Sequence, residues 1–220
     1  MHVEHRVGRG LGSDGEVAEG GPLKKPAVFI DRDGTINEQM GYINHISRFV
    51  LLPGSAEAIK LLNDHGYLVI IVSNQSGVAR GYFPMELVNE VHDHMKALLA
   101  RDNAGVDGIF FCPHYPKGKL PEYSRVCECR KPKTGLIKMA CGDFDIDMAN
   151  SYVIGDRCTD IELARNAGLK GVLVKTGYGL GDLEYVFPHL PFKPFHTTDD
   201  LLDAARWIVK RDSGIEELRN

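Results

Sequence analysis

The sequence predicts an α/β protein built on one parallel sheet with helices on both of its faces. Five short apolar runs, rich in β-branched and aromatic residues, alternate with amphipathic segments of helical spacing. Runs that are apolar almost throughout are typical of parallel strands buried on both faces. Polar residues follow the runs, at the edge where an open parallel sheet binds its ligands. Together these observations indicate a doubly wound, Rossmann-like fold.

Strands and helices alternate from residue 27 onward. We expect strands at residues 27–31, 67–73, 108–112, 151–156 and 171–176. The segments between them predict helices at residues 55–65, 85–101, 134–141 and 159–167. A last helix, at residues 199–210, would pack on the outside with Trp207 on its apolar side. Helices that link successive parallel strands would cover both faces of the sheet.

The chain has the length of one domain preceded by a short tail. Its 220 residues suit a single hydrophobic core. Residues 1–26 are rich in Gly, Glu, His and Arg without an apolar period, so we expect a mobile tail there and one domain at residues 27–220. The spaced glycines of GRGLGSDG follow no strand and therefore do not indicate a nucleotide loop.

Charge and hydropathy argue against two classes of partner. The formal net charge is -4 and Lys and Arg form no face-sized run, so we expect no nucleic-acid partner. No run of about 18 apolar residues could span a membrane, and residues 1–26 lack the apolar stretch of a signal peptide. We therefore expect a cytoplasmic protein that contacts no membrane, and we expect it to be a monomer.

Two acids, Asp31 and Asp33, end the first predicted strand in VFIDRDGT. A calcium loop is excluded, because its sixth position needs glycine and its twelfth glutamate, whereas Gly34 is fourth here and Tyr42 twelfth. A simple turn remains the ordinary interpretation of Asp-Gly alone. Asp156 ends the fourth predicted strand and can reach the same edge. Three carboxylates there would repel one another unless a divalent cation such as Mg²⁺ neutralised them.

Polar residues at two other points of the chain suit a phosphate group. Ser73 and Asn74 end the second predicted strand with a hydroxyl and an amide. Arg130 and Lys131 precede a predicted helix, where Arg offers a planar fork and Lys a point charge to phosphate oxygens. Arg130 and Lys131 alone would be read as a solvated surface pair. Their combination with the acids favours a phosphate site.

Three of the five cysteines lie close together in the sequence, beside a histidine. Cys112, His114, Cys127 and Cys129 supply a full tetrahedral set with no open position, which predicts a structural Zn²⁺. In a reducing compartment such a cluster indicates a metal before disulfides, and incidental buried cysteines are the alternative. Zinc would order this short loop, which leads directly into Arg130.

Weaker features of the sequence receive ordinary interpretations. We expect Cys141 in the core and Cys158 at the start of a helix. GYGLGD at residues 177–182 opens no clear helix, so we expect a surface loop. His92 and His94 lie two apart on a helix and cannot face one site together, so we expect both to be solvated.

Four segments resemble, in order, the motifs of the haloacid dehalogenase-like superfamily of phosphotransferases: DRDGT, SNQ, the lysine of RKPKTG, and GDRCTD. The resemblance implies that Asp31 is a nucleophile that forms an aspartyl-phosphate and that Asp33 is the general acid and base. It implies that Ser73 and Lys131 bind the transferring phosphoryl oxygens. It also implies that Mg²⁺ is held by Asp31, the backbone carbonyl of Asp33, and Asp156.

Over about residues 27–176 the chain is similar to the D-glycero-D-manno-heptose 1,7-bisphosphate 7-phosphatase and histidinol-phosphatase family. The segments that carry this are DRDGTIN, GYI, SNQSGVARG, CPH, CxCRKP and GDR, and neither gap between motifs could house a large cap domain. The resemblance implies an open cleft for a small phosphorylated sugar, with substrate contacts at Gln39, Met40, Gly41, Tyr42, Ser73, Asn74, Gln75, Ser76, Arg130, Lys131 and Arg157. The family commonly has Lys where Arg157 stands, which keeps the charge but alters the shape.

The expected reaction is removal of the 7-phosphate of heptose 1,7-bisphosphate, with Arg130 holding the other end of the substrate. Histidinol phosphate is the alternative substrate. Two other classes remain. A nucleic-acid 3′-phosphatase would require a basic groove with stacking aromatics, which the net charge of -4 does not favour. A non-catalytic module organised by zinc would not need the acids that the chain retains.

Overall fold

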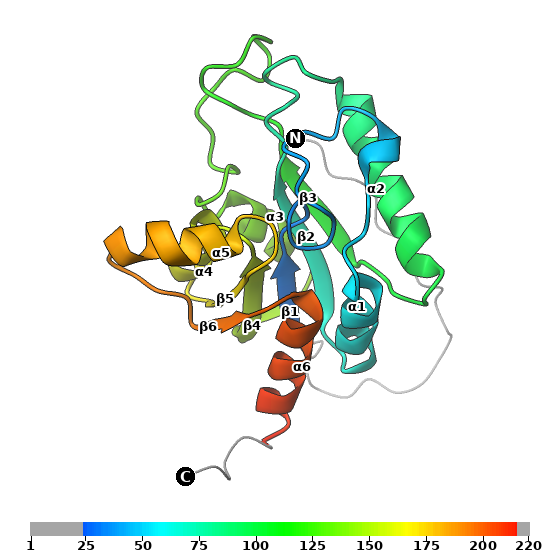
Figure 1. Cartoon of the computed structure of the whole chain (residues 1–220), viewed down its shortest axis with the longest axis vertical. Helices are drawn as coiled ribbons and strands as arrows, with labels where there is room; N and C mark the ends of the chain where they lie inside the picture. The colour runs from blue at the N-terminus through cyan, green and yellow to red at the C-terminus, as the bar shows by residue number, and fades with distance from the viewer. Residues whose placement is uncertain (1–23, 215–220) are drawn as a thin grey trace.

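The computed structural model describes residues 24–214, and its centre is a six-stranded parallel sheet (Figure 1). The strand order β3-β2-β1-β4-β5-β6 is that of a doubly wound fold, which confirms the predicted class. The strands are β1 (Lys25–Ile30), β2 (Leu68–Asn74), β3 (Gly108–Cys112), β4 (Ile146–Gly155), β5 (Lys170–Val174) and β6 (His196–Thr198). Five of them match the expected strands, and β6 is additional. Of the predicted tail, residues 1–23 lie outside the described residues.

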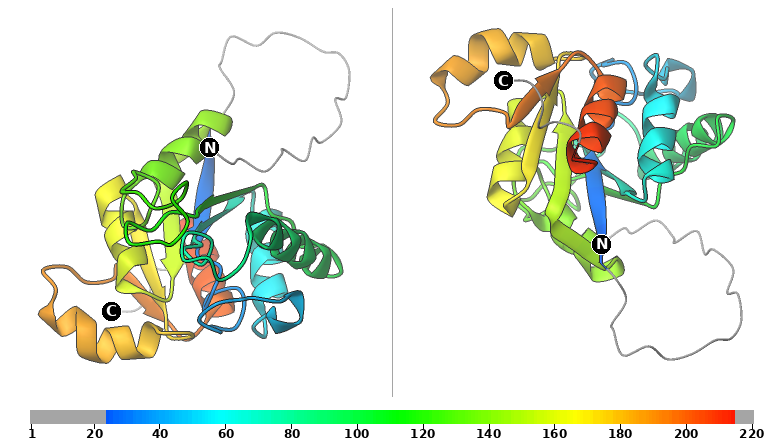
Figure 2. Two further views of the ribbon diagram at one scale, coloured as in Figure 1. Left: turned by 90° about the horizontal axis from the view of Figure 1, so that it is seen from above. Right: turned by 90° about the horizontal axis from the view of Figure 1, so that it is seen from below.

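Helices cover both faces of the sheet, as the two end-on views of Figure 2 show. On one face lie α1 (Ser55–Asp64), α2 (Met85–Ala100) and α6 (Leu201–Asp212). On the other lie α3 (Gly135–Asp143) and α4 (Cys158–Ala167). Within residues 24–214, no helix combines the length and the apolar character needed to cross a membrane.

The alternating side chains of β1 divide the core into two layers. Val28 and Ile30 pack in the cluster that contains the inner faces of α1, α2 and α6. Ala27 and Phe29 pack in the cluster with α3 and α4. Successive residues of a strand point to opposite faces, so a strand covered on both sides must be apolar at every position. This is the physical reason for the continuous apolar runs in the sequence.

The register of the central strands aligns the residues that follow them. Ile30 pairs with Ile71 of β2 on one side and with Ile154 of β4 on the other. Beyond Ile30, the backbone N–H of Asp31 donates to the carbonyl of Ile154 at 2.9 Å. The carboxyl ends of β1, β2 and β4 therefore meet at one edge, where the strand order places a ligand site.

Short connections leave this edge without a large cap. Between β1 and β2 the described chain forms only the 3-10 helix η1 (Ile46–Arg48) and α1, and between β2 and β3 it forms α2. From β3 to α3 the chain runs through residues 113–134 without a regular element, in the green loop at the top of Figure 1. Residues 24–214 therefore contain no large cap domain, as expected.

The carboxyl end of α6 is fastened near the opposite edge of the sheet. The hydroxyls of Tyr67 and Tyr152 both donate to the carboxylate of Asp212, at 2.7 Å from Tyr152. Trp207 packs edge-on against Tyr152, with ring centroids 6.2 Å apart, as expected for the apolar side of this helix. These contacts hold α6 on the sheet at a distance from the strand ends that carry the polar residues.

Two expectations about single side chains are wrong. His92 is fully buried, because α2 turns it inward on the same face as Val88 and Met95, while His94 faces another side. Cys141 is exposed, because the inner face of α3 is formed by Leu136, Ile137 and Ala140. Cys158 is the first residue of α4, as expected.

Candidate active site

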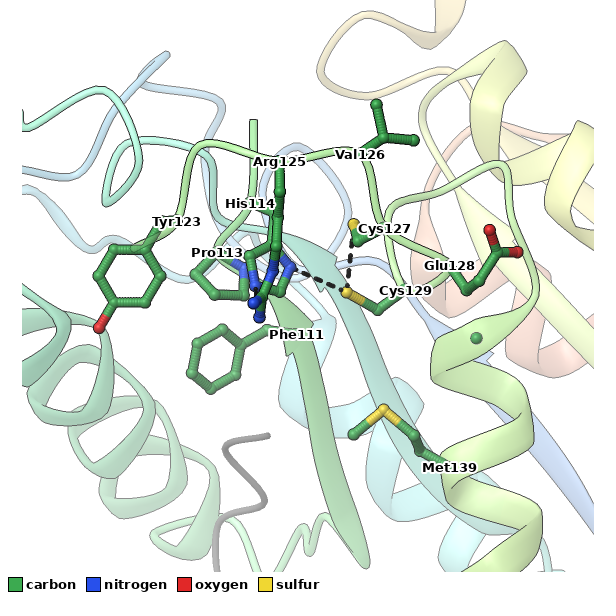
Figure 3. A pocket seen from close by; sticks show the side chains of 11 residues that line it. Phe111, Pro113, His114, Tyr123, Arg125, Val126, Cys127, Glu128, Cys129 and Met139 are labelled. Atoms are coloured by element: carbon green, nitrogen blue, oxygen red, sulfur yellow. Dashed lines mark hydrogen bonds between the residues drawn. The ribbon is translucent and has the colours of Figure 1, made fainter. Parts of the chain in front are cut away.

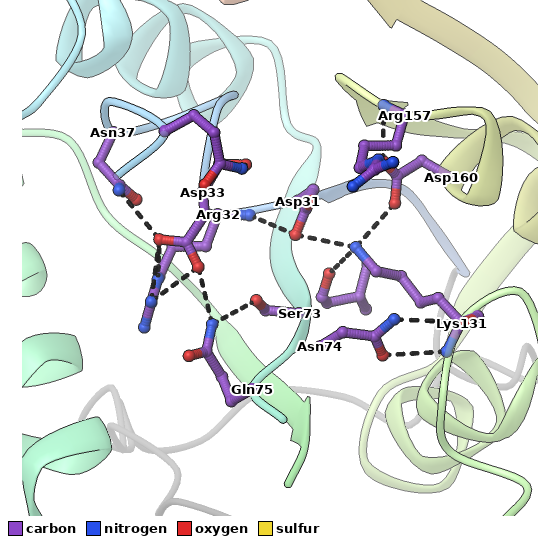
Figure 4. A network of polar contacts seen from close by, with 12 residues as sticks. Asp31, Arg32, Asp33, Asn37, Ser73, Asn74, Gln75, Lys131, Arg157 and Asp160 are labelled. Carbon is purple, nitrogen blue, oxygen red and sulfur yellow. Dashed lines mark hydrogen bonds and ion pairs between the residues drawn. The ribbon is translucent and has the colours of Figure 1, made fainter. Parts of the chain in front are cut away.

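Asp31 lies at the centre of a polar network at the carboxyl edge of the sheet (Figure 4). Its Oδ1 is 2.8 Å from Nζ of Lys131 and accepts the backbone N–H of Arg32 at 2.7 Å. The pKa of Asp31 is raised to about 6, because burial and the nearby charge of Asp160 raise it more than Lys131 lowers it. The negative charge of this carboxylate is buried and only partly balanced by Lys131. A carboxylate in such a site is suited to attack an electrophile.

Lys131 is buried, and its ammonium group contacts three acceptors. Nζ lies 2.8 Å from Asp31, 2.7 Å from Asp160 and 2.9 Å from the carbonyl oxygen of Val72. The backbone of Lys131 is held as well, because its N–H donates to Oδ1 of Asn74 at 3.1 Å and its carbonyl accepts from Nδ2 of the same amide at 3.3 Å. Asn74 therefore positions the lysine, and its amide is already engaged there instead of facing a phosphate.

Asp160 belongs to the site, although sequence reasoning gave it no role. It stands in the first turn of α4, where its Oδ2 accepts the backbone N–H of Arg157 at 3.1 Å. Its other oxygen pairs with Lys131. GDRCTD contains the signal that could have revealed it, since an acid four residues after Asp156 falls in the first helical turn beside the strand end.

Asp156, at the end of β4, is held by backbone. Its Oδ2 accepts the N–H of Tyr178 at 2.8 Å, while its buried Oδ1 has no hydrogen-bond partner within residues 24–214. A Cβ added to Gly34 or Gly177 would lie only 2.2 or 2.1 Å from Oδ2, so only glycine fits at either position. The expected surface loop at residues 177–182 is therefore wrong in part, because it forms the short helix α5 (Gly179–Gly181) and binds this acid.

The acids at this edge suit a divalent cation. Carboxylate oxygens of Asp31, Asp156 and Asp160 lie within 4.8 Å of one another. Burial, followed by the charge of Asp31, raises the pKa of Asp156 to about 8. Both carboxylate oxygens of Asp160 are engaged, one by Lys131 and the other by the N–H of Arg157, whereas Lys131 and the N–H of Arg32 both contact Oδ1 of Asp31. Asp31 and Asp156 can therefore share an ion. Mg²⁺ is usually bound in this way, through one or two carboxylates with water and phosphate oxygens completing its shell.

Asp33 is held in a network of its own, on the other side of the strand end (Figure 4). Arg32 donates to both of its carboxylate oxygens, at 2.8 and 2.9 Å, and Gln75 donates to Oδ2 at 2.8 Å. Burial would raise the pKa of Asp33, but Arg32, Asn37 and Gln75 together lower it below its ordinary value.

The Arg32 side chain is fully buried and continues this network into the core, which the sequence alone did not reveal. Its Nη1 donates to Nε2 of His92 at 3.2 Å. Burial lowers the pKa of His92 well below its ordinary value, and the charge of Arg32 lowers it further, so the ring is neutral and can accept this bond.

Among the remaining residues expected to contact substrate, Ser73 and Gln39 bond to the network around Asp33. Ser73 is buried and accepts Nε2 of Gln75 at 2.8 Å, and Ser76 is also buried. Gln39 donates to the carbonyl of Asp33 at 3.3 Å. In the same loop Met40 is half-buried, the N–H of Gly41 donates to Gln39, and the ring of Tyr42 is partly exposed.

The two arginines expected to contact substrate lie on different segments of the chain. Arg130 is half-buried, and its Nη1 donates to the carbonyl of His114 at 3.3 Å. Arg157 is more exposed; it lies over the ring of Tyr178 at 4.5 Å, with its Nε 3.8 Å from Asp182. Arg130 directly precedes Lys131, and Arg157 directly follows Asp156, so each predicted arginine adjoins a residue of the polar network.

The four residues proposed from sequence as zinc ligands come together on the loop after β3. The sulfur atoms of Cys112, Cys127 and Cys129 lie 3.2 to 3.5 Å apart, and Nδ1 of His114 lies 3.2 Å from Cys129 and 3.7 Å from Cys112. Ligands about 2.3 Å from a tetrahedral Zn²⁺ would stand about 3.8 Å apart. The separations are slightly shorter than this, and all four cysteine and histidine donors fit one ion.

The electrostatics of this cluster also suit a metal. All five cysteines of the chain are free, and hydrogen bonding with Cys112 lowers the pKa of the Cys129 thiol to about 5. A pocket of about 480 Å³ lies beside the cluster. Figure 3 shows the side chains that line it, among them Phe111, Pro113, Tyr123 and Met139. Apolar side chains thus border the cluster on one side.

Comparisons with known proteins identify the family. A family model described as HAD-hydrolase-like matches residues 128–204. The chain is 40% identical over 190 residues to the D-glycero-D-manno-heptose-1,7-bisphosphate 7-phosphatase of Thermosynechococcus vestitus, covering 84% of this chain and 96% of that protein. It is 42% identical to the D-glycero-beta-D-manno-heptose-1,7-bisphosphate 7-phosphatase of Escherichia coli, over 84% of this chain and 88% of that one.

A solved structure is similar over the same region. The D,D-heptose 1,7-bisphosphate phosphatase of B. bronchiseptica, crystallised with magnesium and phosphate, superposes with a TM-score of 0.75. It is 33% identical, and the match covers 84% of this chain and 99% of that one. The four motif segments, their convergence at one sheet edge and these relatives agree. The chain therefore belongs to the D-glycero-D-manno-heptose 1,7-bisphosphate 7-phosphatase family of haloacid dehalogenase-like phosphatases.

Proposed function

We propose that this chain hydrolyses the 7-phosphate of D-glycero-D-manno-heptose 1,7-bisphosphate through an aspartyl-phosphate on Asp31. The observation that carries the proposal is the placement of Asp31 between a buried lysine and a second acid, Asp156, at the switch point of the sheet. The names of the similar proteins support the sugar bisphosphate as substrate. No comparable observation favours histidinol phosphate, a nucleic-acid end or a non-catalytic role.

The first step transfers the phosphoryl group to the protein. A carboxylate oxygen of Asp31 forms a bond to phosphorus while the bond from phosphorus to the sugar oxygen breaks. Lys131 and the hydroxyl of Ser73 bind the equatorial phosphoryl oxygens, where charge is spread in the transition state. Asp33 gives its proton to the leaving sugar oxygen, which departs as an alcohol.

The second step returns Asp31 to its starting form. Asp33, now ionised, accepts a proton from water as the water oxygen attacks phosphorus, and the bond between phosphorus and Asp31 breaks. Inorganic phosphate leaves. The Arg32, Asn37 and Gln75 contacts lower the pKa of Asp33 and favour its ionised form, which suits this step. The first step requires Asp33 to be protonated, so substrate binding must weaken these contacts.

The acids support a magnesium site as part of this proposal. Asp31, Asp156 and the backbone carbonyl of Asp33 would hold Mg²⁺, which would neutralise phosphate charge when bound. Asp33 therefore contributes its carbonyl to the ion and its carboxylate to proton transfer. The unpartnered Oδ1 of Asp156 is the observation within residues 24–214 that supports this assignment.

A panel of substrates tests the proposed activity. Turnover should require Mg²⁺, and kcat/KM should be highest for one anomer of heptose 1,7-bisphosphate, because only this substrate occupies both ends of the cleft. Both anomers, histidinol phosphate and an aryl phosphate are compared in steady-state assays that measure released phosphate. Higher kcat/KM for histidinol phosphate than for either bisphosphate anomer would overturn the proposed substrate.

We also propose that Cys112, His114, Cys127 and Cys129 hold one structural Zn²⁺, and Cys127→Ser tests this. The variant should lose its zinc, and its Tm should fall by about 5 to 15 °C, because metal binding contributes directly to the stability of the loop. Zinc content is measured by atomic emission and Tm by calorimetry with Mg²⁺ present. Cys141→Ser is the matched control, since Cys141 is exposed and lies outside the cluster. Full zinc content in Cys127→Ser would contradict the ligand set.

A further inference from the structure

Two arginines, on the segments that follow β2 and β3, share one tyrosine ring. The guanidinium carbon of Arg80 lies 3.7 Å from the ring centroid of Tyr115, and that of Arg130 lies 5.5 Å from the same centroid. The two carbons are therefore no farther apart than the sum of these distances, about 9 Å. Neither arginine forms an ion pair with a carboxylate in the described part of the chain. Two like charges this close repel each other unless an anion lies between or beside them.

Backbone hydrogen bonds fix Arg80 beside the zinc loop. The N–H of Ala79 donates to the carbonyl of Pro113 at 3.3 Å, and the carbonyl of Ala79 accepts the N–H of Leu120 at 3.0 Å. Arg80 follows directly in the sequence, so its backbone is held against the loop that carries Tyr115 and Arg130. The two guanidinium groups are thus brought together by bonds between loops, and not by a chance approach of free side chains.

Aromatic groups complete the surroundings of Arg80. Burial would lower the pKa of this guanidinium, but a hydrogen bond with Tyr115 and the nearby Tyr42 and Tyr82 hydroxyls raise it. The rings of Tyr42 and Tyr82 are themselves in edge contact, with centroids 4.8 Å apart. Nε of Arg80 is buried without a hydrogen-bond partner among residues 24–214. Stacking on tyrosine restricts the guanidinium and lowers the entropic cost of binding an anion.

We propose that Arg80 is a specificity-determining residue that, together with Arg130, binds the second phosphate group of a bisphosphate substrate. This inference rests on the proposed function. Arg130 directly precedes Lys131, whose ammonium contacts the nucleophile Asp31. The same short segment thus serves the reacting phosphate through Lys131 and the remote one through Arg130. Arg80 adds a second planar fork to the remote end, where a phosphate dianion can accept from both arginines.

Arg80→Met tests the inference with two substrates that differ only in the remote phosphate. The substrates are heptose 1,7-bisphosphate and heptose 7-phosphate. The variant keeps an apolar stem on Tyr115 but loses the charge, so kcat/KM for the bisphosphate should fall by about 10- to 100-fold, chiefly through KM. For heptose 7-phosphate, kcat/KM should change less than about 3-fold, because the lost contact is absent from that substrate. For the bisphosphate, kcat/KM of Arg80→Lys should lie between the values of the wild type and Arg80→Met, because lysine keeps the positive charge but lacks the planar guanidinium fork.

Arg206→Met is the matched control, because Arg206 is an exposed arginine on α6 that pairs with Glu57. This variant should leave kcat/KM unchanged for both substrates. If kcat/KM of Arg80→Met falls by the same factor for both substrates, Arg80 has a structural role. If kcat/KM is unchanged for both substrates, Arg80 takes no part in recognition. If Arg80→Met does not fold, Arg80→Lys takes its place. A smaller ratio of kcat/KM for the bisphosphate to kcat/KM for heptose 7-phosphate than in the wild type would then support the inference, and an unchanged ratio would contradict it. A wild type that does not prefer the bisphosphate would overturn the proposed function itself, and this inference with it.

Discussion

Replacing Asp31 with asparagine is expected to lower kcat by about 10⁴-fold or more, because an amide cannot act as the carboxylate nucleophile. The variant should also fail to form a phosphorylated protein. Steady-state turnover of the bisphosphate is measured first. Mass spectrometry of acid-quenched protein then looks for the phosphoryl adduct, which is expected in the wild type during turnover. Full turnover by Asp31→Asn would exclude the covalent mechanism.

Unfolding of the Asp31→Asn variant should not explain the lost activity. Burial raises the pKa of Asp31 to about 6, above the value of 3.8 for an unperturbed carboxyl, so holding the ionised form in the folded protein costs stability at pH 7. Asparagine has a similar shape and no charge to desolvate. We therefore expect Tm of the variant to equal or exceed that of the wild type at pH 7. A large fall in Tm would mean that the Asp31 pairing with Lys131 stabilises the fold more than its desolvation costs.

Lys131→Met is expected to destabilise the protein by about 3 to 5 kcal/mol and to abolish turnover, because it leaves two buried carboxylates without their common cation. The affected acids are Asp31 and Asp160, which lie 2.8 and 2.7 Å from the ammonium. Denaturant unfolding measures the free energy difference from the wild type at pH 7 and again at pH 5. In the variant the unpaired acids take up protons as the pH falls. The difference should therefore be smaller at pH 5.

Lys133→Met provides the comparison two residues away. Lys133 pairs with Glu128 at 2.9 Å, but both side chains are exposed to solvent, so the loss of this pair should change the free energy of unfolding little. The contrast separates a buried cation from a surface one on the same loop. If Lys131→Met unfolded at the same denaturant concentration as Lys133→Met, the buried ion pairs would not contribute to stability as we infer.

The sequence was informative wherever one local pattern decides the structure. Apolar runs with no polar position predicted five of the strands, because strands buried on both faces tolerate few polar residues. The sixth strand, β6, has the sequence HTT, and it joins the sheet through backbone pairing of Val172 with His196. One histidine and two threonines do not form an apolar run, so the sequence gives no sign of this strand. Edge strands of this kind depend on their neighbour and not on their own composition.

The sequence also predicted those residues of the candidate site that directly follow a strand, and it missed others. Strand ends identified Asp31, Ser73 and Asp156, because parallel strands bring their carboxyl ends together. Asp160 and Arg32 were missed, since their roles come from pairing with partners distant in sequence or from burial that a motif does not display. The wrong expectation that His92 is solvated has a similar cause. Helical spacing shows that it and His94 face different sides, but only packing decides which of the two lies inside.

The close packing of backbone around the Asp156 carboxylate has an evolutionary consequence. Two glycines from distant parts of the chain, Gly34 and Gly177, approach its carboxylate where no side chain could fit, and Thr176 donates to the carbonyl of Gly34 at 2.6 Å. Neither glycine offers a functional group, yet any replacement would displace the acid or the loops that hold it. Selection for activity would thus act on these two positions as strictly as on the acids, while leaving most of the surrounding surface free to diverge.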